Sequence, residues 1–328
     1  MKDIFIFNNG RLKRTDSTIQ FIDADGKKKT IPIVQVENIH LFGEIDMNTS
    51  FLNLLTQQGV VLHTYNYYGY YSGSFIPRSK QVSGYIDVRQ ASHILDPQKR
   101  IFIARQFIYG AVHHMLKNIR QHKDGSEVYI NTIESVRVNI ENAKTIPELM
   151  GMEGNIRKIY FQSFNHMIKN EFFHFVKREK RPPKDPINAL ISFGNSIMYT
   201  TVLSELYKTQ LNPTMSFLHE PSVKRYSLSL DLAEIFKPLI IDGLIVSLIN
   251  NRVMKSNHFE YIESEICLLN DEGRKIFLKA YEEKLSKTIK HRTLKRQTSY
   301  RFLIRLECYK LIKHIIGDTT YKPLKAWW

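Results

Sequence analysis

The sequence predicts an α+β protein in which a small amino-terminal β domain, residues 1–84, precedes a larger, mostly α-helical domain, residues 85–328. Short apolar runs separated by turn residues fill the first part of the chain, which is typical of strands. After about residue 84 the apolar residues recur at helical intervals over longer segments. With 328 residues, 43% of them hydrophobic and 24% charged, the chain is long enough for two folded globular domains.

The β domain begins with the run IFIF and continues through TIQFI and TIPIV. The pair Asp25-Gly26 stands between the last two runs and predicts a hairpin. A short helix is expected over 48–58, because Asn48 can cap it and Gly59 can end it. The run VVLHTYNYY then resumes the sheet.

Residues 64–75, TYNYYGYYSGSF, are rich in tyrosine. Aromatic faces can stack on unpaired bases, so the cluster is one candidate surface for nucleic acid. It is equally compatible with a self-association face or with the apolar side of a strand. The local content of Lys and Arg around the cluster is low until Arg78, which favours the self-association face and the apolar side of a strand over nucleic acid.

The helical domain is expected to contain a helix over 96–118 that starts at an Asp-Pro signal. His113 and His114 are neighbours in it and point about 100° apart, so we interpret them as packing or surface residues. Another helix is expected from Asn188 to about Tyr207, after the basic turn REKRPPKDP. Asn188 is either a helix cap or a weak candidate for supporting a site.

Pro147 opens a further segment, in which Glu153 stands between Gly151 and Gly154 ahead of an aromatic helix. Glycines beside an acid let a ligand come close. The alternative is a helix break with an exposed glutamate.

The stretch from Phe217 to Asp242 gathers a histidine and two acids before a long apolar helix. Asp231 and Glu234 are three residues apart and share one helix face, where two carboxylates repel unless a cation, a basic side chain or a shared proton intervenes. His219 lies just upstream, so a divalent cation would satisfy all three. The alternative is an ordinary amphipathic helix with solvated acids and a loop histidine.

The formal charge is +15, and the sequence pI of about 9.6 favours a polyanionic partner. From Arg274 to Trp328 there are 15 Lys and Arg against 4 Asp and Glu, and the most basic part is Lys284 to Arg296. We expect a basic helix there that binds phosphates, or else a merely solvated face.

Other classes are disfavoured by the sequence. The longest apolar run, from Pro238 to Ile249, is interrupted by Asp242 and is too short to span a bilayer, so we expect no membrane helix. The acid at position 3 and the short apolar run after it predict that no secretory signal is encoded at the amino terminus. Cys267 and Cys308 are expected to be buried thiols, with a disulfide between them as the alternative. Both features point to the cytoplasm. No P-loop, GxGxxG or CxxC pair is visible.

Six collinear blocks are distributed along essentially the whole chain: GRLKRTDSTIQF, IHLFGEIDMNT, NYYGYYSGSFIPR, MEGNIRKIYF, RPPKDPINALISFGNSIMY and FLHEPSVKRYSLSLDLAEIFKP. In these blocks the chain resembles the CRISPR-associated endonucleases and integrases of spacer acquisition, the family numbered first among the Cas proteins. The NYYGYYSGSF wording is most similar to the subtype I-B branch.

The resemblance implies that the β domain dimerises and that the helical domain is catalytic. It implies a divalent ion, Mn²⁺ or Mg²⁺, held by Glu153, His219 and Glu234, with Asp231 in support, orienting a ligand or binding a second ion. The last ligand is often Asp in relatives and is Glu here, which adds a methylene group. The implied partners are a second copy of the chain, a small ferredoxin-like companion Cas protein, duplex prespacer DNA and the leader end of a CRISPR array.

The expected reaction is metal-dependent integration of prespacer DNA into a CRISPR array, with DNA cleavage as its companion activity. The alternative is a non-catalytic architectural protein that binds nucleic acid. The basic side chains expected to contact DNA are Arg181, Lys184, Lys224, Arg225, Lys290, Arg292, Lys295 and Arg296.

Overall fold

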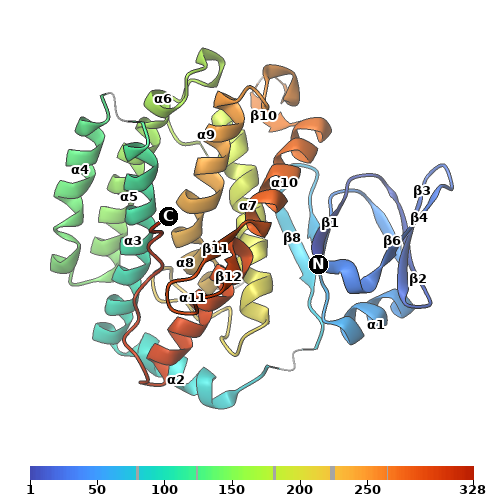
Figure 1. The fold of residues 1–328 in the computed structure, drawn as a ribbon, viewed down its shortest axis with the longest axis horizontal. Helices are drawn as coiled ribbons and strands as arrows, with labels where there is room; N and C mark the ends of the chain where they lie inside the picture. The colour runs from blue at the N-terminus through green and yellow to red at the C-terminus, as the bar shows by residue number, and fades with distance from the viewer. Residues whose placement is uncertain (79–80, 123–124, 180–181, 222–225, 264) are drawn as a thin grey trace. The chain divides into compact units, whose positions relative to one another are not determined.

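The computed structural model describes residues 1–328 except 79–80, 123–124, 180–181, 222–225 and 264. The chain divides into two compact units, Met1–Val82 and Ser83–Trp328. The first is built mainly on sheets and the second mainly on helices, so the predicted α+β class is confirmed (Figure 1). The dimerising and catalytic roles expected of the two parts stay predictions.

The amino-terminal unit contains two four-stranded sheets, ordered β1-β5-β7-β8 and β4-β3-β2-β6. Its strands are β1 (Lys2–Ile6), β2 (Gly10–Thr15), β3 (Thr18–Asp23), β4 (Lys28–Pro32), β5 (Val36–Leu41), β6 (Ile45–Met47), β7 (Val61–Tyr65) and β8 (Tyr71–Phe75). The Asp25-Gly26 hairpin is confirmed, because β3 and β4 pair antiparallel and Ile19 lies opposite Ile31. In the other sheet β1 and β5 pair parallel, as do β5 and β7.

Helix α1 (Thr49–Gln58) closes the core of this unit. The Asn48 side chain accepts a hydrogen bond from the Phe51 amide, and Gly59 ends the helix at a φ of 68°, as its sequence predicts. Phe51, Leu54 and Leu55 are buried, and each stabilises the fold by about 1.5–3 kcal/mol through the apolar surface removed from water.

The tyrosine cluster divides between the interior and the surface. Tyr65 is buried and donates a hydrogen bond to, or accepts one from, His40 at 2.8 Å. Tyr67 and Tyr68 lie in the turn between β7 and β8 and are exposed. The contacts expected of this exposed pair, with protein or with nucleic acid, stay predictions.

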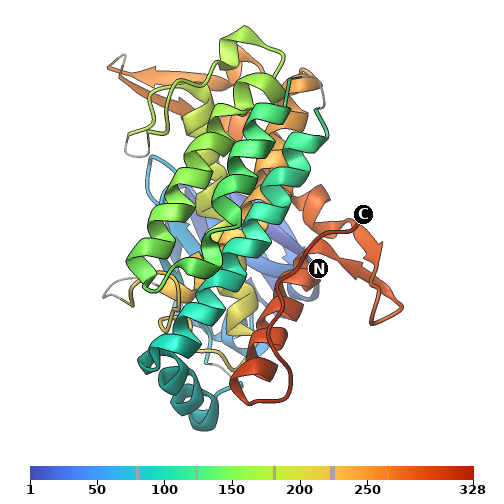
Figure 2. The ribbon, with the colours of Figure 1, turned by 90° about the vertical axis from the view of Figure 1, so that its left-hand side faces the viewer.

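The described part of the second unit is a helical assembly with two small hairpins. Its helices are α2 (Gly84–Leu95), α3 (Pro97–Arg120), α4 (Glu127–Arg137), α5 (Ile146–Gln162), α6 (Phe164–Met167), α7 (Pro186–Tyr207), α8 (Ser227–Phe236), α9 (Gly243–Asn250), α10 (Asp271–Ser286) and α11 (Tyr300–Ile315). Its strands are β9 (Phe259–Ile262), β10 (Ile266–Leu269), β11 (Thr288–Lys290) and β12 (Gln297–Ser299). Helices α3, α4 and α5 lie side by side in both views (Figures 1 and 2).

Helix α3 connects several parts of this unit, since it contacts α2, α4, α5 and α8. Asp96 caps it, as predicted, by accepting from the amides of Gln98 and Lys99. His114 is buried: its Nδ1 donates to the Ile235 carbonyl at 2.8 Å, and its Nε2 accepts from the Ala326 amide at 3.1 Å. The interpretation of His114 as a packing residue is confirmed.

The predicted long apolar helix after Ser227 is not regular. Helix α8 passes into a π-helical segment, η4 (Lys237–Asp242), before α9 begins. Pro238 has no amide hydrogen and its ring conflicts with an α-helical carbonyl four residues back, which the wider turn relieves. Single π turns often occur where a helix carries functional residues.

The predicted basic helix over 284–296 is wrong for most of its length. Helix α10 ends at Ser286, and β11 and β12 form an antiparallel hairpin in which Ile289 lies opposite Thr298. Figure 2 shows this hairpin projecting from the helices. Cys267 and Cys308 are free and buried, as expected. No described helix is both long and apolar enough to cross a bilayer.

Candidate active site

Asp231 fixes the loop that precedes α8. Its side chain is fully buried, and its two oxygens accept from the amides of Phe217, Leu218 and His219 at 2.7–2.9 Å. The same carboxylate accepts from Nδ1 of His219 at 2.7 Å. Both oxygens thus have partners within the protein, which favours orienting a ligand over binding a second ion.

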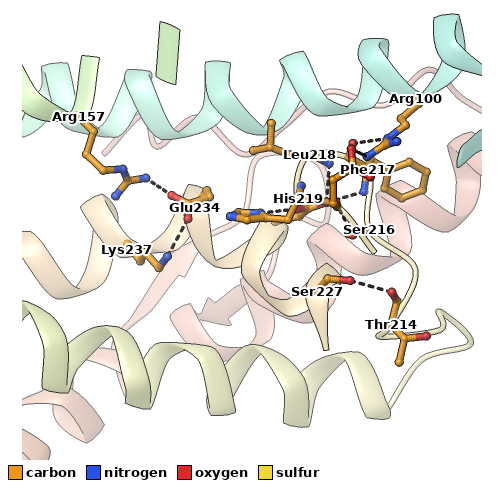
Figure 3. Close-up of polar contacts among 12 residues, drawn as sticks. Arg100, Arg157, Thr214, Ser216, Phe217, Leu218, His219, Ser227, Glu234 and Lys237 are labelled. Atoms are coloured by element: carbon orange, nitrogen blue, oxygen red, sulfur yellow. Dashed lines mark hydrogen bonds and ion pairs between the residues drawn. The ribbon is translucent and has the colours of Figure 1, made fainter. Parts of the chain in front are cut away.

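A further contact ties this loop to α3. The Arg100 guanidinium donates to the Phe217 carbonyl at 2.9 Å and to the Glu220 carboxylate at 2.8 Å (Figure 3). The loop carrying His219 is therefore held from two sides, by Asp231 of α8 and by Arg100.

The His219 imidazole points toward the Glu234 carboxylate (Figure 3). Because Nδ1 donates to Asp231, the neutral ring keeps a lone pair on Nε2. Among the described residues, Nε2 has no hydrogen-bond partner. Burial acts to lower the pKa of His219, but the hydrogen bond and charge of Asp231 raise it above its ordinary value.

Arg157 joins the two glutamates. From α5, its Nε donates to Glu153 at 2.6 Å. Its terminal nitrogen donates to Glu234 of α8 (Figure 3). Lys237 donates to the other oxygen of Glu234 at 2.7 Å. Burial would raise the pKa of Glu234, but Arg157 and Lys237 hold it well below its usual range. The alternative of solvated acids is wrong, because the Glu234 side chain is only 8% exposed and Asp231 is buried.

Glu153 lies within a helix rather than before one. Helix α5 begins at Ile146 and runs without a break through Gly151 and Gly154. The alternative of a helix break with an exposed glutamate is therefore wrong, since two glycines do not outweigh the helix-forming residues and tertiary contacts around them. The Glu153 side chain is 14% exposed.

The residue types fit a hard divalent ion: two carboxylates and one imidazole suit Mn²⁺ or Mg²⁺. In the structure these carboxylates bond to side-chain cations: three of the four oxygens of Glu153 and Glu234 accept hydrogen bonds from Arg157 and Lys237. Within the described residues, no three His, Cys, Asp or Glu side chains are grouped closely enough to hold an ion as they stand. Glu153, His219 and Glu234 thus share one region and have the required donors, with Arg157 between the acids.

Several groups at this site escaped prediction. Arg157 follows Glu153 by four residues, a spacing that places both on one helix face and that the MEGNIRKIYF block displays. Asp242, the acid interrupting the apolar run, is buried and hydrogen-bonds Tyr160. Asn118 donates to the hydroxyl of Tyr160 and to the Pro238 carbonyl, both at 2.8 Å. Together these contacts support η4 behind Glu234.

Asn188 is not the cap of its helix. The Asp185 side chain caps α7, accepting from the Asn188 amide at 2.8 Å. The Asn188 side chain is buried and bonds the Lys177 carbonyl, the Glu179 amide and the Arg178 guanidinium. Its observed contacts therefore fasten the loop before α7.

The basic residues expected to meet DNA fall into three groups. Arg181, Lys224 and Arg225 lie outside the described residues. Lys184 is exposed just before α7. The remaining four lie on or between β11 and β12 and are exposed, and no described carboxylate forms an ion pair with any of them: Lys290, Arg292, Lys295 and Arg296. Their DNA contacts stay predictions.

The chain is similar in sequence and in fold to known proteins. The family model described as CRISPR associated protein Cas1 matches residues 4–283. A CRISPR-associated endonuclease Cas1 of Clostridium perfringens is 56% identical over all of this chain and 99% of its own length. A Cas1 protein structure from Thermotoga maritima is 38% identical, covers 98% of this chain and all of its own, and superposes with a TM-score of 0.89.

A more distant structure, a casposase bound to integration product, shares the fold at a TM-score of 0.88 and 18% identity, over all of this chain and 94% of its own. The family model matches residues 4–283, and one relative is 56% identical from end to end. The chain therefore belongs to the Cas1 family.

Proposed function

We propose that this chain is a divalent-metal-dependent DNA endonuclease and integrase that inserts prespacer DNA into a CRISPR array. The observation that carries the proposal is that Arg157 joins Glu153 to Glu234, while His219, oriented by Asp231, points toward Glu234. The names of the similar proteins support it, since one is called an endonuclease and a protein of the same fold was captured with an integration product.

The reaction is a transesterification. The 3′-oxygen of the prespacer attacks a phosphorus atom of the target strand, a new P–O bond forms, and the bond to the target's own 3′-oxygen breaks. The attacking hydroxyl loses its proton and the departing oxygen gains one, so no covalent protein intermediate is required. With water as the attacking group, the same site cleaves DNA.

In this proposal Glu153, His219 and Glu234 are the residues that would hold the ion, and Asp231 would fix the orientation of the His219 ring through its bond to Nδ1. When bound, Mn²⁺ or Mg²⁺ supplies Lewis acidity at the phosphoryl oxygen and at the attacking hydroxyl. The protein contributes the alignment of the two DNA strands, for which the β11–β12 hairpin offers Lys290, Arg292, Lys295 and Arg296. Lys224 and Arg225 remain candidates for the phosphate nearest the reaction, on sequence grounds.

The proposed partners follow from the same kinship. A related structure is a complex that contains both Cas1 and Cas2, which supports a small companion Cas protein for this chain. We include in the proposal a homodimer formed through the amino-terminal unit.

The test is strand transfer of a labelled prespacer into a supercoiled plasmid carrying a CRISPR leader, with the companion protein, in Mn²⁺ or in EDTA. We expect Glu153→Gln and Glu234→Gln to lower the rate at least a hundredfold while DNA binding at low salt persists. Glu148→Gln, an exposed acid at the start of α5, is the matched control and should keep full activity. Strand transfer in EDTA as fast as in Mn²⁺, or in both site variants as fast as in the unaltered protein, would refute the proposal. The alternative of an architectural DNA-binding protein would then be favoured.

A further inference from the structure

Arg157 stands where an ion shared by Glu153 and Glu234 would have to lie. Its guanidinium reaches both carboxylates with different nitrogens, Nε to Glu153 at 2.6 Å and a terminal nitrogen to Glu234. The arginine side chain is only 18% exposed. A planar fork held between two acids in this way is a specific arrangement, because lysine at the same position would offer one point charge.

The charges of this cluster already balance. Two carboxylates, Glu153 and Glu234, face two cations, Arg157 and Lys237. Adding a divalent ion without any rearrangement would leave two surplus positive charges in a largely buried region, which is costly. Arginine does not lose its proton in proteins, so the conflict cannot be relieved by neutralising it. Movement or deprotonation of Lys237 would remove only one of the two surplus charges. The guanidinium bonds both acids, so it has to move if Glu153 and Glu234 are to hold one ion together.

Two negative groups can receive it. Asp242 lies close enough to Arg157 to interact with its charge and is buried in the same region. The phosphates of DNA supply the second, and arginine binds phosphate through the same fork of N–H donors. Asp242 is present whether or not DNA is bound. Only the DNA phosphates can therefore make the movement of the Arg157 guanidinium depend on DNA binding.

We propose that Arg157 is a built-in competitor of the divalent ion, which closes the carboxylate pair in the free protein and releases it when DNA phosphate offers the guanidinium another partner. The proposal rests on the metal site of the proposed function. It assigns Arg157 as a positioning residue that couples ion binding to DNA binding. Linkage requires the coupling to be reciprocal, so the ion must also tighten DNA binding by the same factor.

The test measures Mn²⁺ affinity directly, by titration calorimetry and by the electron paramagnetic resonance signal of free Mn²⁺, with and without a DNA duplex. In the unaltered protein we expect DNA to tighten Mn²⁺ binding at least tenfold. Arg157→Gln should bind Mn²⁺ at least tenfold more tightly than the unaltered protein in the absence of DNA, and DNA should then change the affinity less than threefold. These readouts do not depend on catalysis.

Lys158→Gln is the matched control, because it removes one positive charge from the next residue of α5, which is exposed. It should leave both the affinity and the coupling unchanged. Arg157→Lys keeps the charge but loses the fork and should give intermediate values. If Arg157→Gln does not melt cooperatively, the Arg157→Lys protein decides: affinity equal to or weaker than the unaltered protein without DNA would overturn the proposal.

The outcomes separate this proposal from the one on which it rests. If Glu153→Gln and Glu234→Gln leave Mn²⁺ binding unchanged, the metal site itself is wrongly assigned. If they abolish binding while Arg157→Gln fails to tighten it, the site stands and the competitor role fails.

Discussion

Asp242 is a carboxyl group buried in the helical unit at the end of η4. Burial raises its pKa from 3.8 to about 7, against the opposing effects of the Arg157 charge and the Tyr160 hydrogen bond. The folded protein therefore holds this proton more tightly than the unfolded chain does. The resulting stabilisation is fully present below about pH 4 and is lost as the pH rises through about 7.

We expect the free energy of unfolding, measured by urea denaturation in EDTA, to lose a few kcal/mol from this group between pH 4 and pH 8. Asp242→Asn cannot ionise, so its unfolding free energy should change less over the same range. Asp25→Asn, at an exposed position in the amino-terminal unit, is the control and should follow the unaltered protein. An identical pH profile for Asp242→Asn would contradict the assignment.

At the scale of single residues the sequence predicts which carboxylates share a helix face better than it predicts which residues bond to them. Asp231 and Glu234 stand three apart on a helix, so their shared face is visible in the sequence. Their different partners are not: Asp231 bonds amides 12 to 14 residues upstream, whereas Glu234 meets Arg157 from 77 residues away. Contacts of that kind depend on how α5 packs near α8, which no local pattern states.

Helix α5 carries two glycines beside Glu153, and both positions are open. A Cβ atom added at Gly151 or at Gly154 meets nothing within 4 Å among the described residues. The backbone there is helical and leaves the helix less stable than alanine would, by about 0.5–1 kcal/mol at each position.

Gly154→Ala should therefore raise the free energy of unfolding by about 0.5–1 kcal/mol, as measured by urea denaturation. Gly194→Ala in α7 should do the opposite, because its Cβ would lie 2.6 Å from a methyl group of Ile241. If Gly154→Ala is stabilised but loses strand transfer, the open surface beside Glu153 is needed for DNA to approach closely. A destabilised Gly154→Ala protein would mean that the helix is not regular there.

Elements with their own capping signals are predictable, as α1 shows: Asn48 and Gly59 mark both of its ends within the sequence. The β11–β12 hairpin is not predictable in this way. Its strands have three residues each, and Lys295 takes a φ of 55° in the turn, where glycine or asparagine is the usual signal. A run of lysines and arginines suits an exposed helix as well as an exposed hairpin, so charge alone does not decide between them.

The molecule as a whole carries its positive charge unevenly, since most of the excess lies after residue 274. Replacing Lys290, Arg292, Lys295 and Arg296 together by Gln should weaken DNA binding and make it less sensitive to salt. If all four meet phosphates, the slope of log K against log salt concentration falls in magnitude by about 3 to 4. Fluorescence anisotropy of a labelled duplex over a range of salt concentrations measures it.

The control for this experiment replaces Lys27, Lys28 and Lys29, exposed lysines at the β3–β4 turn. No DNA contact is proposed for these three lysines, so the slope should be unchanged. An unchanged slope in the hairpin variant would remove the hairpin from the DNA-binding surface.

At this scale the change of sequence period is what makes the fold predictable. Alternating short runs before about residue 84 and helical spacing after it correspond to the two kinds of unit, because each period reflects which side chains one element can bury. The sequence does not reveal how α3, α5 and α8 meet, since each has an apolar face that other helices could cover. The grouping of Glu153 with His219 and Glu234 is predicted by the family resemblance and not by the periodicity of the sequence.

The hydrogen bond between His114 and Ala326 cannot form until the ribosome has made nearly the whole chain. The Ala326 amide that this bond requires is made 212 residues after His114, which takes a ribosome roughly 10 to 40 seconds at about 5–20 residues per second. Strand pairing within residues 1–82 needs no such wait. The nascent chain thus carries a folded amino-terminal unit while α3 still lacks the Ala326 contact. Exposure to chaperones and proteases during translation therefore falls mainly on the helical unit, which contains Glu153, His219 and Glu234.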